Sequence, residues 1–138
     1  MKKEINIAWI DDDIHILEPV IEPLDRAGYK IKRIFYLEEA REAIKEDGVF
    51  DLIILDLLLP DNKADEGSIK YPGKEFLEEI RYEKKLKTPV IIFSVVNRSG
   101  ILESLKKIGV DDILHKPIRP LELKERVEAV LRKYEIIK

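Results

Sequence analysis

Three consecutive carboxylates, Asp11, Asp12 and Asp13, follow directly after the apolar run NIAWI, which ends at Ile10. Two carboxylates about 4 Å apart cost each other roughly 4 kcal/mol at an effective dielectric constant near 20. A chain tolerates such a cluster when a cation compensates the charge, or when the pKa of one carboxyl group rises. A hard divalent cation that prefers oxygen ligands, most naturally Mg²⁺, suits this set of donors.

Three other polar groups end apolar runs in the same way. Asp56 follows LIIL within DLIILDLLLP, Ser94 ends VIIFS, and Lys116 follows DILH. With a divalent cation present, a phosphate could approach the carboxylates, and Asp56 could attack phosphorus as a nucleophile. Lys116 and the cation would then neutralise charge on the phosphoryl oxygens, and Ser94 would donate a hydrogen bond to one of them.

The elements that must position these groups alternate between short apolar runs and segments of helical periodicity. Continuous apolar runs rich in β-branched residues predict strands buried on both faces, as in a parallel sheet. The predicted strands are Ile5–Ile10, Ile31–Phe35, Leu52–Leu55, Val90–Phe93 and Ile113–Leu114. Apolar residues at helical spacing predict a helix after each strand. Five such units predict an α/β fold, an open parallel sheet covered by helices on both faces.

The carboxyl ends of the predicted strands carry the polar groups. Ligands of a doubly wound sheet bind beyond this edge. Taken alone, the first three aspartates fit equally well a helix N-cap followed by acidic residues of the first turn. With Asp56 and Lys116 at the same edge, metal binding by Asp11 and Asp12 is favoured, and Asp13 is predicted to be the cap.

Two segments depart from the simple pattern. Pro19 and Pro23 lie inside the first helical period, where each removes a hydrogen bond and crowds the preceding turn, so this helix is expected to start late or to bend. The polar stretch Asp61–Pro72 is longer than most connections of a βα unit. It is predicted to be either mobile or functional, folding over the site or serving as a surface for a partner.

The composition fits one soluble globular domain over residues 1–138. With 45% hydrophobic and 38% charged residues, the chain has enough apolar side chains for a core. The net charge of −3 argues against a dedicated nucleic-acid or membrane-surface binder. The lack of cysteine excludes disulfides, thiolate metal sites and cysteine nucleophiles. No signal peptide or membrane span is predicted, and a cytoplasmic location is expected.

The chain resembles the receiver domains of two-component response regulators, such as the chemotaxis regulator. The matching pieces are IDDD, DLIILDLLLP, VIIFS and GVDDILHKP, in the order of the family, and the resemblance covers essentially the whole chain. It implies a doubly wound, flavodoxin-like, five-stranded parallel sheet of strand order 2-1-3-4-5. It also implies a phosphoprotein of phosphorelay signal transduction, not an enzyme; the domain would catalyse only its own phosphorylation and dephosphorylation.

The resemblance implies a Mg²⁺ site beside the phospho-acceptor. Asp56 would accept the phosphoryl group and also bind the metal. Asp12 would be a direct ligand, and Asp11 would bind mainly through water. The backbone carbonyl of Leu58, two residues beyond the acceptor, would be a further ligand.

The resemblance also assigns the remaining residues and the partners. Ser94 and Lys116 take the hydroxyl and lysine roles, with a cis peptide before Pro117. The phosphodonor would be a phosphohistidine on a histidine kinase or a phosphotransfer protein. Family members usually meet output partners, or form homodimers, through the face of the fourth and fifth strands and the last helix, here including Ile101–Leu105 and Leu121–Val130; no direct contact with nucleic acid or membrane is implied.

Two positions depart from the usual pattern of the family, and two others bear on the lifetime of the phosphate. Ile113 stands where a switch Tyr or Phe is usual, so an aromatic ring is unavailable to turn inward. Val95 replaces the small residue after the hydroxyl and is expected to crowd phosphoryl entry. Leu58 and Val96 occupy the two positions that tune the lifetime of the acyl phosphate. Because both are apolar, attack by water is expected to be poorly assisted and the phosphate on Asp56 to be long-lived.

Two other functions compete with a phosphorylated receiver. The first is a receiver-like interaction module that acts independently of phosphorylation, which Ile113 and Val95 favour and the complete set of polar residues opposes. The second is a phosphatase of the haloacid dehalogenase type, which also uses an aspartate nucleophile and Mg²⁺. That family needs a second aspartate two residues after the nucleophile, and Leu58 at this position excludes it.

Overall fold

Five parallel strands form one sheet in the computed structural model, which describes residues 4–59 and 71–138. The strands are β1 (Asn6–Ile10), β2 (Lys30–Ile34), β3 (Leu52–Leu55), β4 (Val90–Ser94) and β5 (Asp112–His115). Their order across the sheet is β2-β1-β3-β4-β5. This confirms the doubly wound α/β fold and the strand order implied by the resemblance.

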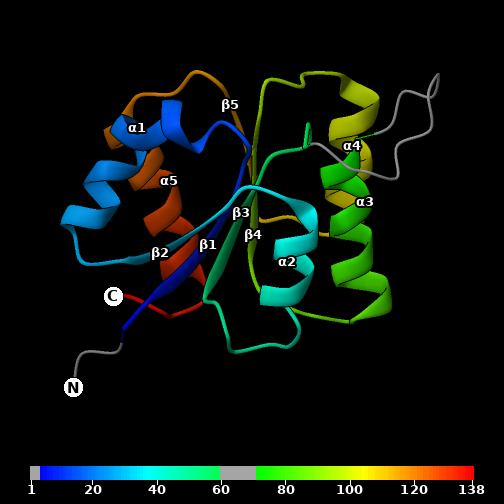
Figure 1. Cartoon of the computed structure of the whole chain (residues 1–138), viewed down its shortest axis with the longest axis horizontal. Helices are drawn as coiled ribbons and strands as arrows, with labels where there is room; N and C mark the ends of the chain where they lie inside the picture. Colours follow the sequence, from blue (N-terminus) through cyan, green and yellow to red (C-terminus); the bar gives the residue numbers. More distant parts are fainter. Residues whose placement is uncertain (1–3, 60–70) are drawn as a thin grey trace.

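Helices cover both faces of this sheet (Figure 1). The helices are α1 (Ile14–Arg26), α2 (Leu37–Ala43), α3 (Pro72–Glu78), α4 (Ser99–Ile108) and α5 (Pro120–Lys133), and a π-helical turn, η1 (Glu79–Glu83), directly extends α3. α1 and α5 pack on one face, and α2, α3 and α4 on the other (Figure 1). Each face has its own apolar cluster, so the central strands are buried from both sides.

The position of each strand explains its sequence. Every residue of β3 and β4 is buried, and their sequences, LIIL and VIIFS, are almost wholly apolar. β2 lies at the edge of the sheet and reads KIKRI, with Lys30 and Lys32 exposed. Charged side chains on an edge strand oppose pairing with another chain.

Helix α1 contains both prolines and begins at Ile14, directly after the aspartates. The helix therefore does not start late, and the alternative, a bend at the prolines, stays a prediction. The helix buries an apolar face that includes Ile14, Leu17 and Ile21 against the sheet. Packing of such a face contributes more to the stability of a helix in a protein than intrinsic propensity does, and here it outweighs the cost of the two prolines.

The connection before α3 was predicted as the polar stretch Asp61–Pro72. Its residues 61–70 lie outside the described part of the chain. Tyr71 is the residue before the helix, and Pro72 is the first residue of α3. The fixed φ of proline suits the first turn of a helix, which has N–H groups without intrahelical partners, so the last residue of the predicted stretch is the first residue of the helix.

Candidate functional site

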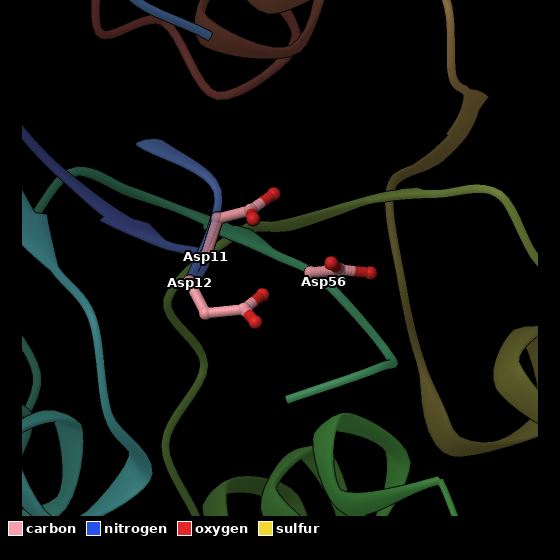
Figure 2. Close-up of side chains that lie close together, drawn as sticks. All are labelled: Asp11, Asp12 and Asp56. Carbon is pink, nitrogen blue, oxygen red and sulfur yellow. The ribbon is translucent and has the colours of Figure 1, made fainter. Parts of the chain in front are cut away.

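Three carboxylates meet at the carboxyl edge of the sheet. Asp11 and Asp12 follow β1, and Asp56 follows the neighbouring strand β3 (Figure 2). One carboxylate oxygen of each residue lies within 4.8 Å of the others. Asp11 and Asp56 are buried, whereas Asp12 is exposed. The cluster predicted from the sequence is therefore present, with one of its members open to solvent.

The sheet fixes the backbone at both buried aspartates. The Asp11 N–H donates to the Ile34 carbonyl at 3.0 Å, and the Asp56 N–H donates to the Ile10 carbonyl at 3.0 Å. These bonds continue the strand pairing by one residue on each strand. The two carboxylates therefore leave the sheet from rigid backbone, which is the arrangement that a preorganised site needs.

Lys116 reaches the same carboxylates from the loop after β5. Its Nζ lies 2.7 Å from Asp11 Oδ2 and 3.2 Å from Asp56 Oδ2. The Lys116 N–H donates to the Ser94 carbonyl at 3.0 Å, and the peptide bond between Lys116 and Pro117 is cis. The cis bond agrees with the one implied by the resemblance. The ammonium group bridges the two buried carboxylates, as a compensating cation should.

The lysine does not remove the electrostatic cost of the cluster. Burial raises the pKa of Asp11 to about 6, against the opposing effects of Lys116 and of the Asp13 N–H. Partial burial and the charge of Asp13 raise the pKa of Asp12. Burial lowers the pKa of Lys116, but the hydrogen bond and charge of Asp11 and the charge of Asp56 outweigh it, so that the net shift is upward. The site therefore retains an excess of negative charge that a divalent cation would stabilise.

Ser94 lies at the end of β4, buried at the same edge. Its Oγ accepts a hydrogen bond from the Val96 N–H at 3.4 Å, which leaves its own proton available for another acceptor. Val95 is 59% exposed and lines a pocket that Lys116 also lines. This pocket is not lined by Asp11, Asp12 or Asp56, so crowding of phosphoryl entry by Val95 stays a prediction.

Two smaller predictions have different outcomes. Asp13 occupies the N-cap position of α1, but its side chain makes no capping bond. Instead, its backbone N–H donates to Asp11 Oδ1 at 2.8 Å, so this donor helps to orient a candidate metal ligand. The Leu58 N–H donates to Asp56 Oδ1 at 3.2 Å, while metal binding by the Leu58 carbonyl stays a prediction.

Gly73, at the second position of α3, supports the acceptor from behind and was not predicted from the sequence. A Cβ at this position would lie 2.1 Å from the Asp56 carbonyl oxygen and 2.7 Å from Leu57 Cα. The Gly73 N–H donates to the Leu57 carbonyl at 3.0 Å. The available signal was a glycine within the first turn of a helix, where it lowers helix propensity and often indicates close approach of another backbone.

Comparison with known proteins finds a family model and relatives that match most of the chain. The sequence model of the response regulator receiver domain matches residues 7–128. The transcriptional regulatory protein CiaR of Streptococcus pneumoniae is 33% identical over 129 residues, which cover 94% of this chain and 52% of that protein. The response regulator GtcR of Aneurinibacillus migulanus is 34% identical over 133 residues, covering 96% of this chain and 49% of that protein.

A solved structure shares the fold. The crystal structure of a CheY-like response regulator receiver domain protein from Methanospirillum hungatei JF-1 matches with a TM-score of 0.80 and 23% identity, over 96% of this chain and 98% of that one. The chain spans about half the length of the curated relatives that it matches. Within residues 4–59 and 71–138, none of the helices combines the length and the apolar character that crossing a bilayer requires.

Proposed function

Because the chain belongs to the receiver domain family of two-component response regulators, we propose that Asp56 accepts a phosphoryl group from a histidine kinase or a phosphotransfer protein. One observation carries this proposal. Lys116 bridges Asp56 and Asp11 at the edge where Asp12 also lies, so that an acceptor, a cation and two further acidic oxygen donors share one small space.

The residues present account for the transfer step. A carboxylate oxygen of Asp56 forms a bond to phosphorus while the bond from phosphorus to the leaving group of the donor breaks. Lys116 is placed to neutralise charge on a phosphoryl oxygen, and the Ser94 hydroxyl to donate a hydrogen bond to another. The rigid backbone at Asp56 keeps the nucleophile oriented, which favours reaction over a freely moving carboxylate.

The donor set fits Mg²⁺. Carboxylate oxygens from Asp11, Asp12 and Asp56 are hard ligands. Burial raises the pKa values of Asp11 and Asp12, so ionising them carries a cost that a bound cation would offset. When bound, the metal would supply positive charge that lets an anionic phosphate approach the carboxylates and that stabilises the transferring group. The Leu58 carbonyl is proposed as a further ligand.

The test is the intact mass of the protein after incubation with acetyl phosphate and Mg²⁺. We expect one phosphoryl group on the wild type and none on Asp56→Asn, because the amide is not a nucleophile for this reaction. Asp51→Asn is a suitable control, since Asp51 precedes the same strand and lies outside the cluster. Equal labelling of wild type and Asp56→Asn would disprove Asp56 as the acceptor.

The phosphorylated form is expected to be long-lived. Leu58 is 43% exposed and Val96 is buried, and neither side chain can orient a water molecule for attack on the acyl phosphate. Leu58→Gln supplies a neutral hydrogen-bonding group, and we expect it to shorten the half-life about fivefold. The decay is followed by intact mass after removal of the donor, with Leu58→Met as the apolar control. A wild-type half-life of seconds in Mg²⁺ would contradict this prediction.

An interaction module independent of phosphorylation is the second candidate, and Ile113 is the observation that favours it. Its side chain is half-buried and packs against the cluster under α2, α3 and α4. An aliphatic side chain cannot make the inward aromatic movement usual in the family. If beryllofluoride with Mg²⁺ leaves the fluorescence of the buried Trp9 unchanged and the mass experiment shows no phosphoryl group, this second function is supported instead.

A further inference from the structure

We infer that Phe93, the residue before Ser94, is a positioning residue that holds the Lys116 ammonium at the phosphoryl site through the face of its ring. This inference rests on the proposed function, because it assigns a role in the same transfer. The Lys116 Nζ lies over the Phe93 ring, 5.5 Å from its centroid. This distance lies within the range of attraction between a cation and an aromatic face.

The ring itself is firmly held. Phe93 is 1% exposed and belongs to the apolar cluster between the sheet and the pair α1 and α5. Its ring meets the ring of Trp9 edge to face, with centroids 6.0 Å apart and an interplanar angle of 85°. Edge-to-face pairs of this kind are energetically favourable. A fixed ring offers the lysine a fixed surface, unlike a mobile side chain.

Lys116 needs such a surface because its other contacts compete with metal binding. Its shortest contact, 2.7 Å, is to Asp11 Oδ2, and Asp11 is also a candidate metal ligand. A cation at the carboxylates would weaken this ion pair and leave a long, flexible side chain with fewer contacts. The ring of Phe93 makes no bond to the carboxylates, so its attraction for the ammonium persists when their charge is compensated. It therefore keeps Lys116 beside Asp56.

The contact is tested first without any phosphodonor or metal. In NMR spectra of protein carrying ¹³C-labelled lysine, the Lys116 ε-methylene signal is identified by its loss in Lys116→Met. A proton above an aromatic face is shielded, so we expect Phe93→Leu to move this signal downfield. Phe93→Tyr retains the ring and should retain the shift, and Phe93 lines a pocket of about 370 Å³.

The role in transfer is tested by the rate of phosphorylation by acetyl phosphate in Mg²⁺. We expect Phe93→Leu to slow the reaction about three- to tenfold and Phe93→Tyr to restore most of the rate. Phe76→Leu is the matched control, since Phe76 is equally buried but packs on the opposite face of the sheet. In a Lys116→Met background the effect of Phe93→Leu should vanish, as in any double-mutant cycle in which one residue acts through the other.

Each outcome decides the inference. If Phe93→Leu slows the reaction equally with and without Lys116, or no more than Phe76→Leu does, the ring has only a structural role and the inference is wrong. An unchanged Lys116 signal in Phe93→Leu also overturns it. Failure of the wild type to take up a phosphoryl group would refute the proposed function instead, and the NMR comparison would then decide alone whether the ring holds the ammonium.

Discussion

Gly73→Ala is expected to lower the free energy of unfolding by about 3 kcal/mol and the midpoint of thermal unfolding by roughly 10 °C. The added Cβ would lie 2.1 Å from the Asp56 carbonyl oxygen, 2.7 Å from Leu57 Cα and 2.9 Å from the Asp56 carbonyl carbon. All three atoms belong to the backbone, so no side-chain rotation relieves the overlap. Either α3 or the end of β3 must move. Denaturant and thermal unfolding measure the loss.

The same substitution should also impair the site. The backbone that must shift carries Asp56, whose carboxylate has to stay within reach of Asp11 and Lys116. At a temperature where the Gly73→Ala protein is still folded, we expect phosphorylation by acetyl phosphate to be slower by about an order of magnitude, because small displacements of a reacting group cost large factors in rate. Intact mass at timed intervals gives this rate.

Gly100→Ala is the matched control within the same chain. Gly100 lies in the first turn of α4, and a Cβ there would meet nothing within 4 Å. Alanine has the higher helix propensity, so this substitution should leave stability unchanged or raise it by about 0.5 kcal/mol. If Gly73→Ala proved as harmless as Gly100→Ala, the close packing of α3 on the end of β3 would be refuted.

The contrast between these glycines shows which features can be predicted from the sequence. The strands were predictable because buried parallel strands are continuous apolar runs, and LIIL and VIIF have few other interpretations. Asp11, Asp56 and Lys116 were predictable as a group because each ends such a run, and parallel strands bring their carboxyl ends to one edge. Local patterns therefore specified both the sheet and the polar residues at its edge.

Features that depend on contacts between distant segments were not predictable in this way. The need for glycine at position 73 arises from the backbone at Asp56, and nothing in the residues around Gly73 reveals that neighbour. The ring of Phe93 was expected only as part of a strand, because its contact with Lys116 requires the register of β4 with β5. In α1, the two prolines predicted a late start, but packing of the helix against the sheet determines where it begins.

Asp11→Asn is expected to stabilise the metal-free protein at pH 7.5 by about 1–2 kcal/mol. Burial raises the pKa of Asp11 from 3.8 to about 6, so the folded protein binds the proton more tightly than the unfolded chain does. The contribution of Asp11 to the free energy of unfolding is therefore highest at low pH and falls as the pH rises from about 4 through 6. Once Asp11 is fully ionised, the fall is about 3 kcal/mol. Asparagine does not ionise and therefore avoids this loss of stability, but the ion pair between residue 11 and Lys116 is lost. Lys116 keeps its other ion pair, with Asp56 at 3.2 Å.

The pH dependence distinguishes this cause from a general change in packing. Near pH 4, the carboxyl group of Asp11 is largely protonated in the folded wild type, so the advantage of Asp11→Asn should shrink towards zero. Urea unfolding at pH 4 and pH 7.5 measures both differences. Asp13→Asn serves as the control, because Asp13 is exposed and its side chain makes no capping bond, and we expect a change within about 0.5 kcal/mol at either pH.

Mg²⁺ should offset part of the stability that Asp11→Asn gains, because the buried carboxylate that destabilises the metal-free protein is also a candidate metal ligand. A ligand that binds only the folded state stabilises it in proportion to the logarithm of its concentration above the dissociation constant. Wild type offers Asp11, Asp12 and Asp56 as charged donors, whereas the variant lacks one of them. We therefore expect millimolar Mg²⁺ to stabilise wild type more than Asp11→Asn at pH 7.5.

Destabilisation of the metal-free variant at that pH would instead mean that the ion pair with Lys116 outweighs the burial of Asp11. Equal stabilisation of both proteins by Mg²⁺ would show that Asp11 contributes little to metal binding.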